Sequence, residues 1–263
     1  MNILNKLTTP DKEELKMAKA ILENPGMAAK ITNFIGSPIE KGFDLLPKDW
    51  RSKIGEVTSK TLLKLTEGTL LTLKDNSKKT TSNIWHKVGA VTSGGVGGFF
   101  GLPALVIELP ISTSIMLRSI TDIARSQGEK INTIESKLAC LEVFALGGDS
   151  KSDDSADTGY FVVRSALARS VAETAEFIAS KGLVEEGSPV ILRFVVKIAQ
   201  RFGVQIGEKS AAQAMPIIGA AGGALINSLF IAHFQDMAKG HFMVRKLERK
   251  YDPDIIKQAY FEL

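Results

Sequence analysis

The 263-residue chain is poor in cysteine and has no segment with the pattern of a β-strand. Its one cysteine, Cys140, excludes an intramolecular disulfide, and its place in the apolar run SKLACLEVFALG predicts a reduced, buried thiol. The N-terminus lacks the continuous apolar region that a secretory signal requires, so we expect the protein to stay in the cytoplasm. Alternation of apolar and polar residues never persists over the length of a strand, which favours an all-α fold.

The sequence also lacks the signatures of nucleotide-binding proteins and of common hydrolases. The glycine-rich stretch VTSGGVGGFFGLPALVIELP has no lysine or arginine after Gly101 until Arg118, so it lacks the cation that a P-loop places on phosphate. No strand precedes it, as a dinucleotide-binding fingerprint requires. The three histidines show no metal-ligand spacing, and no Gly-x-Ser-x-Gly or cysteine protease signature is present. We therefore expect neither a metal nor a cofactor.

The net charge is small. The formal value is +4, and the first 90 residues hold 15 Lys and Arg against 10 Asp and Glu. This excess indicates a weak preference for anionic surfaces and is too small to indicate nucleic acid as a partner.

Apolar residues recur with helical spacing along most of the chain. Thr9 and Pro10 predict the start of the first helix, and Asn132 with Glu135 predicts a capping box for the helix that carries Cys140. The run from Asp49 to Lys74 is amphipathic, and it suits either a surface helix packed on the core or a basic helix at a membrane surface. We expect an N-terminal helical extension over residues 1–48 and one helical domain over residues 49–263.

Two nearly uncharged segments stand out. Val88–Ile107 has 20 uncharged residues and Ala211–Ala232 has 22, which is long enough to cross a bilayer of about 30 Å. Pro103 and Pro216 would each break a helix within its segment. A transmembrane pair, an interfacial association and a buried soluble hairpin all stay open.

Glycines are concentrated in these two segments. Small residues four apart make a groove on a helix into which a second helix can pack. We therefore predict a single-domain helical bundle around a central pair of glycine-rich apolar helices. The packing glycines would be Gly94, Gly95, Gly97, Gly98, Gly101, Gly219, Gly222 and Gly223.

Ionisable and polar side chains beside the apolar segments are the candidate site residues. Glu108 lies between Ile107 and Leu109, where a lone buried carboxylate would be unfavourable unless it is paired or protonated. We expect Glu108 to pair with an arginine of the following helix, or to serve as a functional acid or ligand group. The predicted polar network consists of Glu108, Arg118, Asp122, Arg125, Asn227 and His233.

The chain resembles the EcsC protein family of bacteria. The resemblance lies in the run GAVTSGGVGGFFGLPALVIELPISTSIMLRSITDIARSQGE, in LEVFALGG, and in MPIIGAAGGALINSLFIAHFQDMAKGHFMVRKLE, and it extends from about Trp50 onwards. It implies a helical protein that is cytoplasmic or membrane-associated. It transfers no catalytic residue, because no agreed activity comes with the family.

These observations favour a membrane-associated helical accessory or lipid-contacting protein at the inner face of the cell membrane. Its expected partners are an anionic membrane surface or lipid, or a membrane protein. The alternative is a hydrolase-type enzyme with a polar pocket built on Glu108, Asp122 and His233. That enzyme would need an open cleft with converging polar groups, whereas the accessory protein needs only a sealed pair at Glu108.

Overall fold

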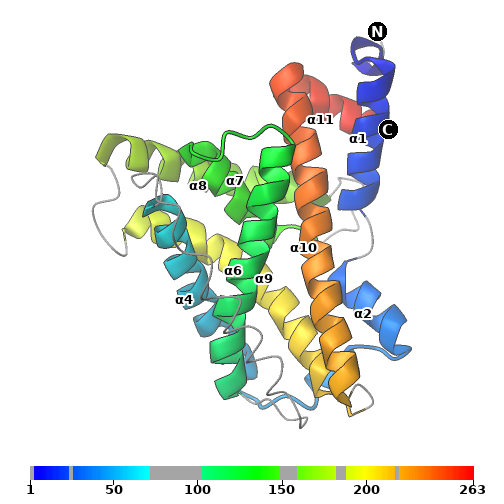
Figure 1. Cartoon of the computed structure of the whole chain (residues 1–263), viewed down its shortest axis with the longest axis vertical. Helices are drawn as coiled ribbons and strands as arrows, with labels where there is room; N and C mark the ends of the chain where they lie inside the picture. The colour runs from blue at the N-terminus through cyan, green and yellow to red at the C-terminus, as the bar shows by residue number, and fades with distance from the viewer. Residues whose placement is uncertain (1–2, 24–25, 72–101, 149–158, 182–187, 217–218) are drawn as a thin grey trace.

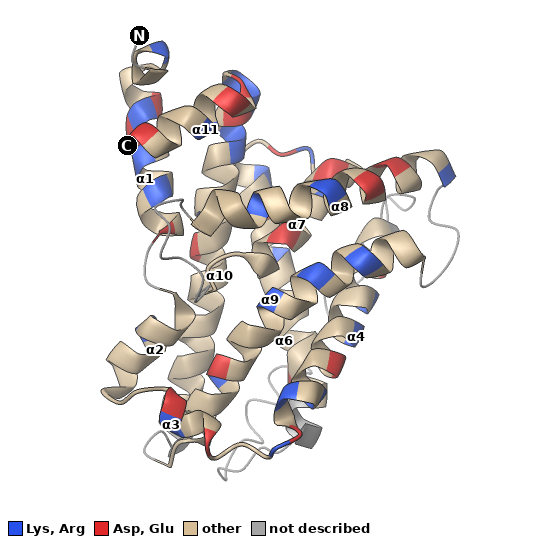
Figure 2. Cartoon of the chain, turned by 180° about the vertical axis from the view of Figure 1, so that it is seen from behind, with Lys and Arg blue, Asp and Glu red and all other residues tan. Residues whose placement is uncertain are grey.

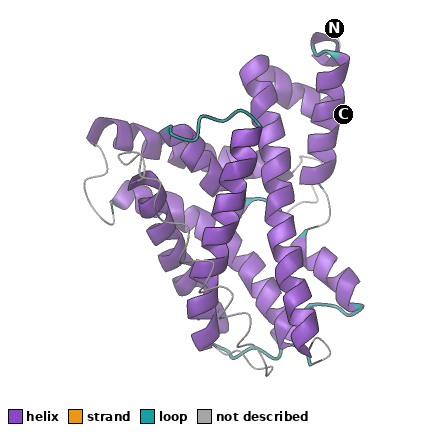
Figure 3. Ribbon diagram, in the orientation of Figure 1, coloured by secondary structure: helices purple, strands orange, loops and turns teal. Residues whose placement is uncertain are grey.

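The computed structural model describes residues 3–23, 26–71, 102–148, 159–181, 188–216 and 219–263. All regular elements of these residues are helices, with no strand among them (Figure 3). The predicted all-α, single-domain fold is confirmed. The elements are the 3₁₀ helices η1 (Ile3–Lys6) and η2 (Val143–Ala145), and the α-helices α1 (Thr9–Leu22), α2 (Met27–Ile35), α3 (Glu40–Phe43), α4 (Trp50–Leu71), α6 (Leu102–Ser126), α7 (Ile134–Glu142), α8 (Gly159–Lys181), α9 (Pro189–Ala214), α10 (Gly219–Lys250) and α11 (Pro253–Glu262).

Helices α6 and α10 run side by side in the same direction, and α9 runs past them in the opposite direction (Figure 1). The Gln235 amide nitrogen donates to the Ser119 hydroxyl at 2.9 Å, which fixes the register of α6 against α10. Helix α4 packs against α9 and α6, while α1 packs along α10. Helices α6 and α10 begin at the end of the molecule where α9 finishes. We call this end the lower end, as it is drawn in Figure 1.

An aromatic cluster joins η2, α9 and α10 at the centre of the core. The ring of Phe144 lies 4.9 Å from that of Phe202 and 5.6 Å from that of Phe234, measured between centroids. Phe230 extends the cluster, with its ring 5.1 Å from that of Phe234. All four side chains are fully buried, so the short LEVFALGG segment, which begins with the last two residues of α7, is anchored by apolar burial.

Helix α6 is longer than the sequence suggested because neither of its prolines ends it. It begins at Leu102, so Pro103 lies in the first turn, where a missing N–H costs little. Pro110 lies inside the helix. Its missing N–H leaves the carbonyl of residue 106 without its helical donor, while the hydroxyls of Thr113 and Ser114 donate to the carbonyls of residues 109 and 110, each at 2.6 Å.

The second apolar segment is divided between two helices. Helix α9 ends at Ala214 and α10 begins at Gly219, so Pro216 lies in the turn that joins them. The segment is therefore the end of one helix and the start of another. In the described part of the chain, no helix combines the length and the apolar character that a membrane crossing requires.

Glycines permit close helix contacts at positions that were not predicted, and the roles of Gly219 and Gly222 stay predictions. A Cβ at Gly240 would lie 2.6 Å from Leu22 Cγ and 3.2 Å from the Ala18 carbonyl oxygen, so this glycine lets α1 approach α10. Among the described residues, a Cβ at Gly223 would meet nothing within 4 Å. The cluster from Gly94 to Gly101 lies outside the described residues, so its packing role stays a prediction.

The predicted caps were displaced by one residue each. The first helix is capped by Thr8, whose hydroxyl accepts from the Asp11 N–H, and α7 is capped by Thr133, whose hydroxyl accepts from the Ser136 N–H. The division between residues 1–48 and 49–263 stays a prediction, although α1 packs on α10 and α3 packs on α9.

Candidate functional site

The expected ion pair of Glu108 with Arg118 or Arg125 does not form in the structure. These residues lie on one continuous helix, where each residue adds about 1.5 Å, so Glu108 and Arg118 are about 15 Å apart along the axis. The Arg118 side chain is exposed. Arg125 pairs instead with Asp122 at 2.6 Å, and both side chains of that pair are more than half exposed.

Glu108 forms an ion pair with Lys209 of α9. The Lys209 side chain is only 6% exposed, whereas that of Glu108 is 30% exposed, so one partner is buried and the other reaches water. The Lys209 ammonium also lies 5.0 Å from the centroid of the Phe230 ring. A buried ammonium needs such a carboxylate, because an unpaired charge in the interior is strongly unfavourable.

A second polar contact lies next to this pair. The Gln213 amide nitrogen donates to the Asn227 side-chain oxygen at 3.3 Å. Gln213 follows Lys209 by four residues on α9, so these two side chains share one face of that helix. Asn227 precedes Phe230 by three residues on α10 and likewise shares a face with it. Gln213 and Asn227 are half-buried. We call Glu108, Lys209, Gln213 and Asn227 the polar junction, and it brings together two of the predicted site residues.

Exposed apolar side chains lie beside the polar junction at the lower end. Val106 and Ile107, directly before Glu108, are 52% and 57% exposed. The register set by Gln235 and Ser119 places Leu225, which is 44% exposed, level with residue 109 of the neighbouring helix. We call Val106, Ile107 and Leu225 the apolar end.

His233 lies away from the polar junction, in the core. It faces the turn after η2, where a Cβ at Gly147 would lie 2.5 Å from its Nε2 atom. Burial lowers the pKa of His233 to about 4, aided by the charge of Lys30 and opposed by Asp236 and the Gly147 backbone. Neither ring nitrogen reaches hydrogen-bond geometry with a partner among the described residues. The imidazole is therefore neutral near pH 7.

The hydrolase pocket predicted from Glu108, Asp122 and His233 is not assembled. Glu108 and Asp122 are 14 residues apart on α6, which separates them by about 21 Å along the axis. His233 is buried against Phe234 of its own helix and the Gly147 turn that follows η2. Among the described residues, no group of three His, Cys, Asp or Glu side chains is placed to hold a metal ion.

Lys209 and Gln213 are the junction residues that the sequence interpretation missed. One signal could have found Lys209, since it is the only lysine or arginine between Arg201 and Lys239. A buried cation in such a stretch needs a carboxylate partner, and Glu108 is the acid that directly follows the other apolar segment, Val88–Ile107.

A second polar cluster is buried at the other end of the molecule, between α7, α8 and α10. Both terminal nitrogens of Arg164 bind the Glu248 carboxylate, at 2.6 and 3.1 Å. The Tyr160 hydroxyl lies 3.0 Å from His241 Nδ1. Burial lowers the pKa of His241 well below its usual value, so this histidine is neutral as well. The sequence interpretation did not find this cluster.

Two further glutamates complete the buried cluster. Arg245 binds Glu129 through Nε at 2.8 Å, and the Ser136 hydroxyl donates to the same carboxylate at 2.7 Å. Glu142, the last residue of α7, is 6% exposed. Burial raises the pKa of Glu142 to about 7, although the charges of Arg164 and Arg245 oppose this.

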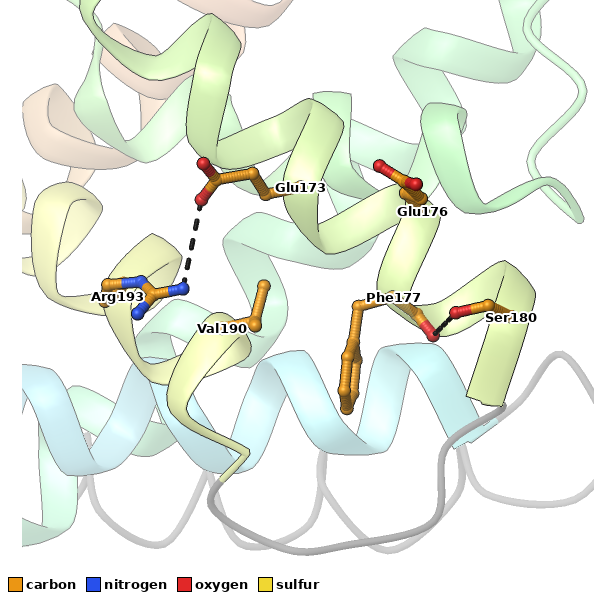
Figure 4. Close-up of a pocket in the computed structure, with 6 residues that line it drawn as sticks. All are labelled: Glu173, Glu176, Phe177, Ser180, Val190 and Arg193. Carbon is orange, nitrogen blue, oxygen red and sulfur yellow. Dashed lines mark hydrogen bonds and ion pairs between the residues drawn. The ribbon is translucent and has the colours of Figure 1, made fainter.

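A surface hollow of about 280 Å³ lies between α8 and α9 (Figure 4). Arg193 and Glu173 face each other across it at 3.9 Å, and the Ser180 hydroxyl donates to the Phe177 carbonyl at 3.1 Å. Glu173 also binds Arg169 at 2.8 Å, so its charge is compensated. The hollow contains none of the predicted site residues.

The comparisons with known proteins identify the family. The profile of the EcsC protein family matches residues 11–247, which is most of the chain, so the chain belongs to the EcsC protein family. The match begins before residue 49, so it includes most of the predicted N-terminal extension. Neither the comparison with curated proteins nor that with solved structures found a significant match.

Proposed function

We propose that this EcsC family protein is a helical accessory protein that contacts lipid at the inner face of the cell membrane through its apolar end. The observation that supports this is the exposure of Val106 and Ile107 directly beside the half-buried polar junction. An apolar edge that borders a polar cluster matches the change from acyl chain to headgroup across a bilayer interface.

The charge distribution agrees with a lower end that enters the interface. Figure 2 shows few charged residues on α2 and on the lower part of α10. The first 17 residues of α10, Gly219 to Gln235, contain no Asp, Glu, Lys or Arg. Exposed Lys41 lies on α3, and exposed Lys48 and Arg51 lie just before and at the start of α4. Figure 2 shows α3 near the same end, where such cations can meet lipid phosphates.

The test compares vesicle binding of matched surface variants. Val106→Asp with Ile107→Asp places two charges on the apolar end, and we expect co-sedimentation with anionic vesicles to fall by about tenfold or more, since each buried apolar side chain contributes about 1.5–3 kcal/mol. The control is Val162→Asp with Leu192→Asp, two residues of α8 and α9 that are 46% and 42% exposed. The control should bind vesicles like the original protein.

Two results would contradict the proposal. If the original protein does not co-sediment with anionic vesicles at low salt, it makes no lipid contact by itself. If both pairs of variants lose binding equally, the apolar end is not the contact surface. Circular dichroism of all variants would establish that each is folded before the comparison is made.

A further inference from the structure

The last turns of α9 are packed by different parts of the chain on two opposite sides. Residues two apart on an α-helix point about 200° from each other around its axis. Gly207 and Ala211 therefore face one side, and Lys209 and Gln213 face the other. The polar junction occupies the side of Lys209 and Gln213, where Lys209 binds Glu108 of α6.

Helix α3 covers the side of Gly207 and Ala211. A Cβ at Gly42 would overlap the Ala211 carbonyl, so the backbones of α3 and α9 are in close contact. A Cβ at Gly207 would lie 3.6 Å from Cε1 of the Phe43 ring. Because Ala211 is three residues from the last residue of α9, these contacts place α3 at the lower end, as Figure 2 shows.

Leu45 lies in the turn after α3 and is left outside this packing. Its N–H donates to the Gly42 carbonyl at 3.2 Å, which ties it to the residue that contacts α9. The neighbouring Leu46 is half-buried against the core, whereas Leu45 is 55% exposed. Among the large apolar side chains that the structure describes, only Ile107 and Met17 are more exposed, at 57% and 56%. The lower end therefore presents Ile107 on one side of α9 and Leu45 on the other.

The charges around Leu45 permit an approach to lipid. Glu40 and Asp44 are exposed acids of the same segment. Lys41 and Lys48, which are exposed as well, offset these charges, so the turn can reach an anionic surface without net repulsion.

We propose that Leu45 forms a second lipid contact, across α9 from the apolar end, so that the protein stands on the bilayer with its lower end down. This inference rests on the proposed lipid contact of the apolar end. One contact would let the molecule tilt on the surface, whereas two contacts on opposite sides of a helix end fix the tilt. Helix α10 has 32 residues and is about 48 Å long, so the upright pose holds its C-terminal end far from the headgroups.

The experiment measures which positions of the bound protein touch lipid. Cys140 is buried, so a cysteine introduced at an exposed position can be labelled selectively. An environment-sensitive fluorophore is placed at Leu45→Cys, Ile107→Cys and Met17→Cys, and vesicles of phosphatidylcholine and phosphatidylglycerol carry nitroxide lipids as quenchers. Met17 is the matched control, because it is as exposed as Leu45 but lies on α1, which packs along α10. We expect quenching at positions 45 and 107 and none at position 17.

A charge substitution repeats the test without a label. Leu45→Asp should weaken vesicle binding by about tenfold or more, because it removes a buried leucine from the contact. Met17→Asp should leave binding unchanged.

The outcomes separate this inference from the proposed function. Quenching at position 107 but not at position 45 would refute the second contact and leave the lipid contact of the apolar end intact. Absence of quenching at both positions would contradict both proposals. Leu192, at the start of α9 and 42% exposed, reports the alternative pose. Quenching of a fluorophore at Leu192→Cys would show that the protein lies on its side, which would overturn the upright pose.

Discussion

Lys209 and Glu108 form one ion pair, but water reaches them unequally. Lys209 is 6% exposed and Glu108 is 30% exposed. When one partner of an ion pair is removed, the loss in the free energy of unfolding depends on whether water can hydrate the remaining charge where it lies. A stranded Glu108 can reach water, whereas a stranded Lys209 is held between α9 and the face of Phe230.

This asymmetry gives a testable order of stability. We expect Glu108→Gln to lower the free energy of unfolding by about 3 kcal/mol, because it strands a buried ammonium, and Lys209→Met to lower it by about 1 kcal/mol. The double variant should recover most of the loss. Urea denaturation at neutral pH measures the free energy of unfolding of all three variants.

Asp122→Asn is the control, because it breaks an exposed pair on the same helix, and it should change the free energy of unfolding by less than about 0.5 kcal/mol. Equal losses in the two single variants would show that the burial difference does not matter.

At the scale of helices, close packing depends on single glycines. Gly240 faces α1 at a distance that leaves no room for a methyl group, while a Cβ at Gly223 would meet open space among the described residues. Both glycines lie inside α10, where a glycine costs about 0.5–1 kcal/mol relative to alanine.

The same substitution should therefore have opposite effects at the two positions. We expect Gly240→Ala to lower the free energy of unfolding by about 1–3 kcal/mol, because the new methyl group overlaps Leu22 and the Ala18 carbonyl. Gly223→Ala should raise it by about 0.5–1 kcal/mol, because alanine favours the helix and meets nothing. Thermal unfolding compares the two variants directly. Destabilisation by both would show that α10 is closely packed at Gly223 as well.

The sequence predicted which segments are helical better than where they meet. Apolar periodicity is a local signal, so it sufficed for the all-α fold and for long helices such as α4 and α9. Pro110 lacks a backbone N–H, yet α6 continues through it to Ser126. The cap of α7 was displaced to Thr133 because two adjacent residues, Asn132 and Thr133, can both serve as caps.

The candidate site was predicted only in part. Glu108 and Asn227 were recognised as polar groups in apolar surroundings, and the structure places both in the polar junction. Their partners come from α9, and Lys209 is 101 residues from Glu108 along the chain. Such pairings depend on helix packing, which a single sequence does not determine. The buried cluster around Glu142 was missed for the same reason, since Arg164 and Glu248 are 84 residues apart.

At the scale of the whole molecule, most cations of the C-terminal half of α10 are neutralised within the fold. Lys239 binds Asp236, Arg245 and Arg249 bind Glu129, Lys246 binds Glu14, and Lys250 binds Asp11. Glu14 and Asp11 belong to α1, so these charges attach the N-terminal helix to α10. These paired cations would be less available to an anionic bilayer than unpaired ones, which favours the lower end as the proposed contact.

This distribution predicts how vesicle binding should respond to charge. We expect tighter binding to anionic than to neutral vesicles, and only a partial loss at high salt, because salt screens the few cations of the lower end but not the burial of the apolar end.

Lys48→Ala with Arg51→Ala should weaken binding to anionic vesicles by about tenfold or more at low salt, since each basic residue near the surface contributes about 1 kcal/mol. Lys246→Ala with Lys250→Ala removes two cations at the end of α10 that lies away from the lower end, so screening over that distance should leave binding within about twofold of the original. Co-sedimentation over a salt series measures both pairs. A greater loss from the α10 pair would mean that the upper end, and not the apolar end, faces the membrane.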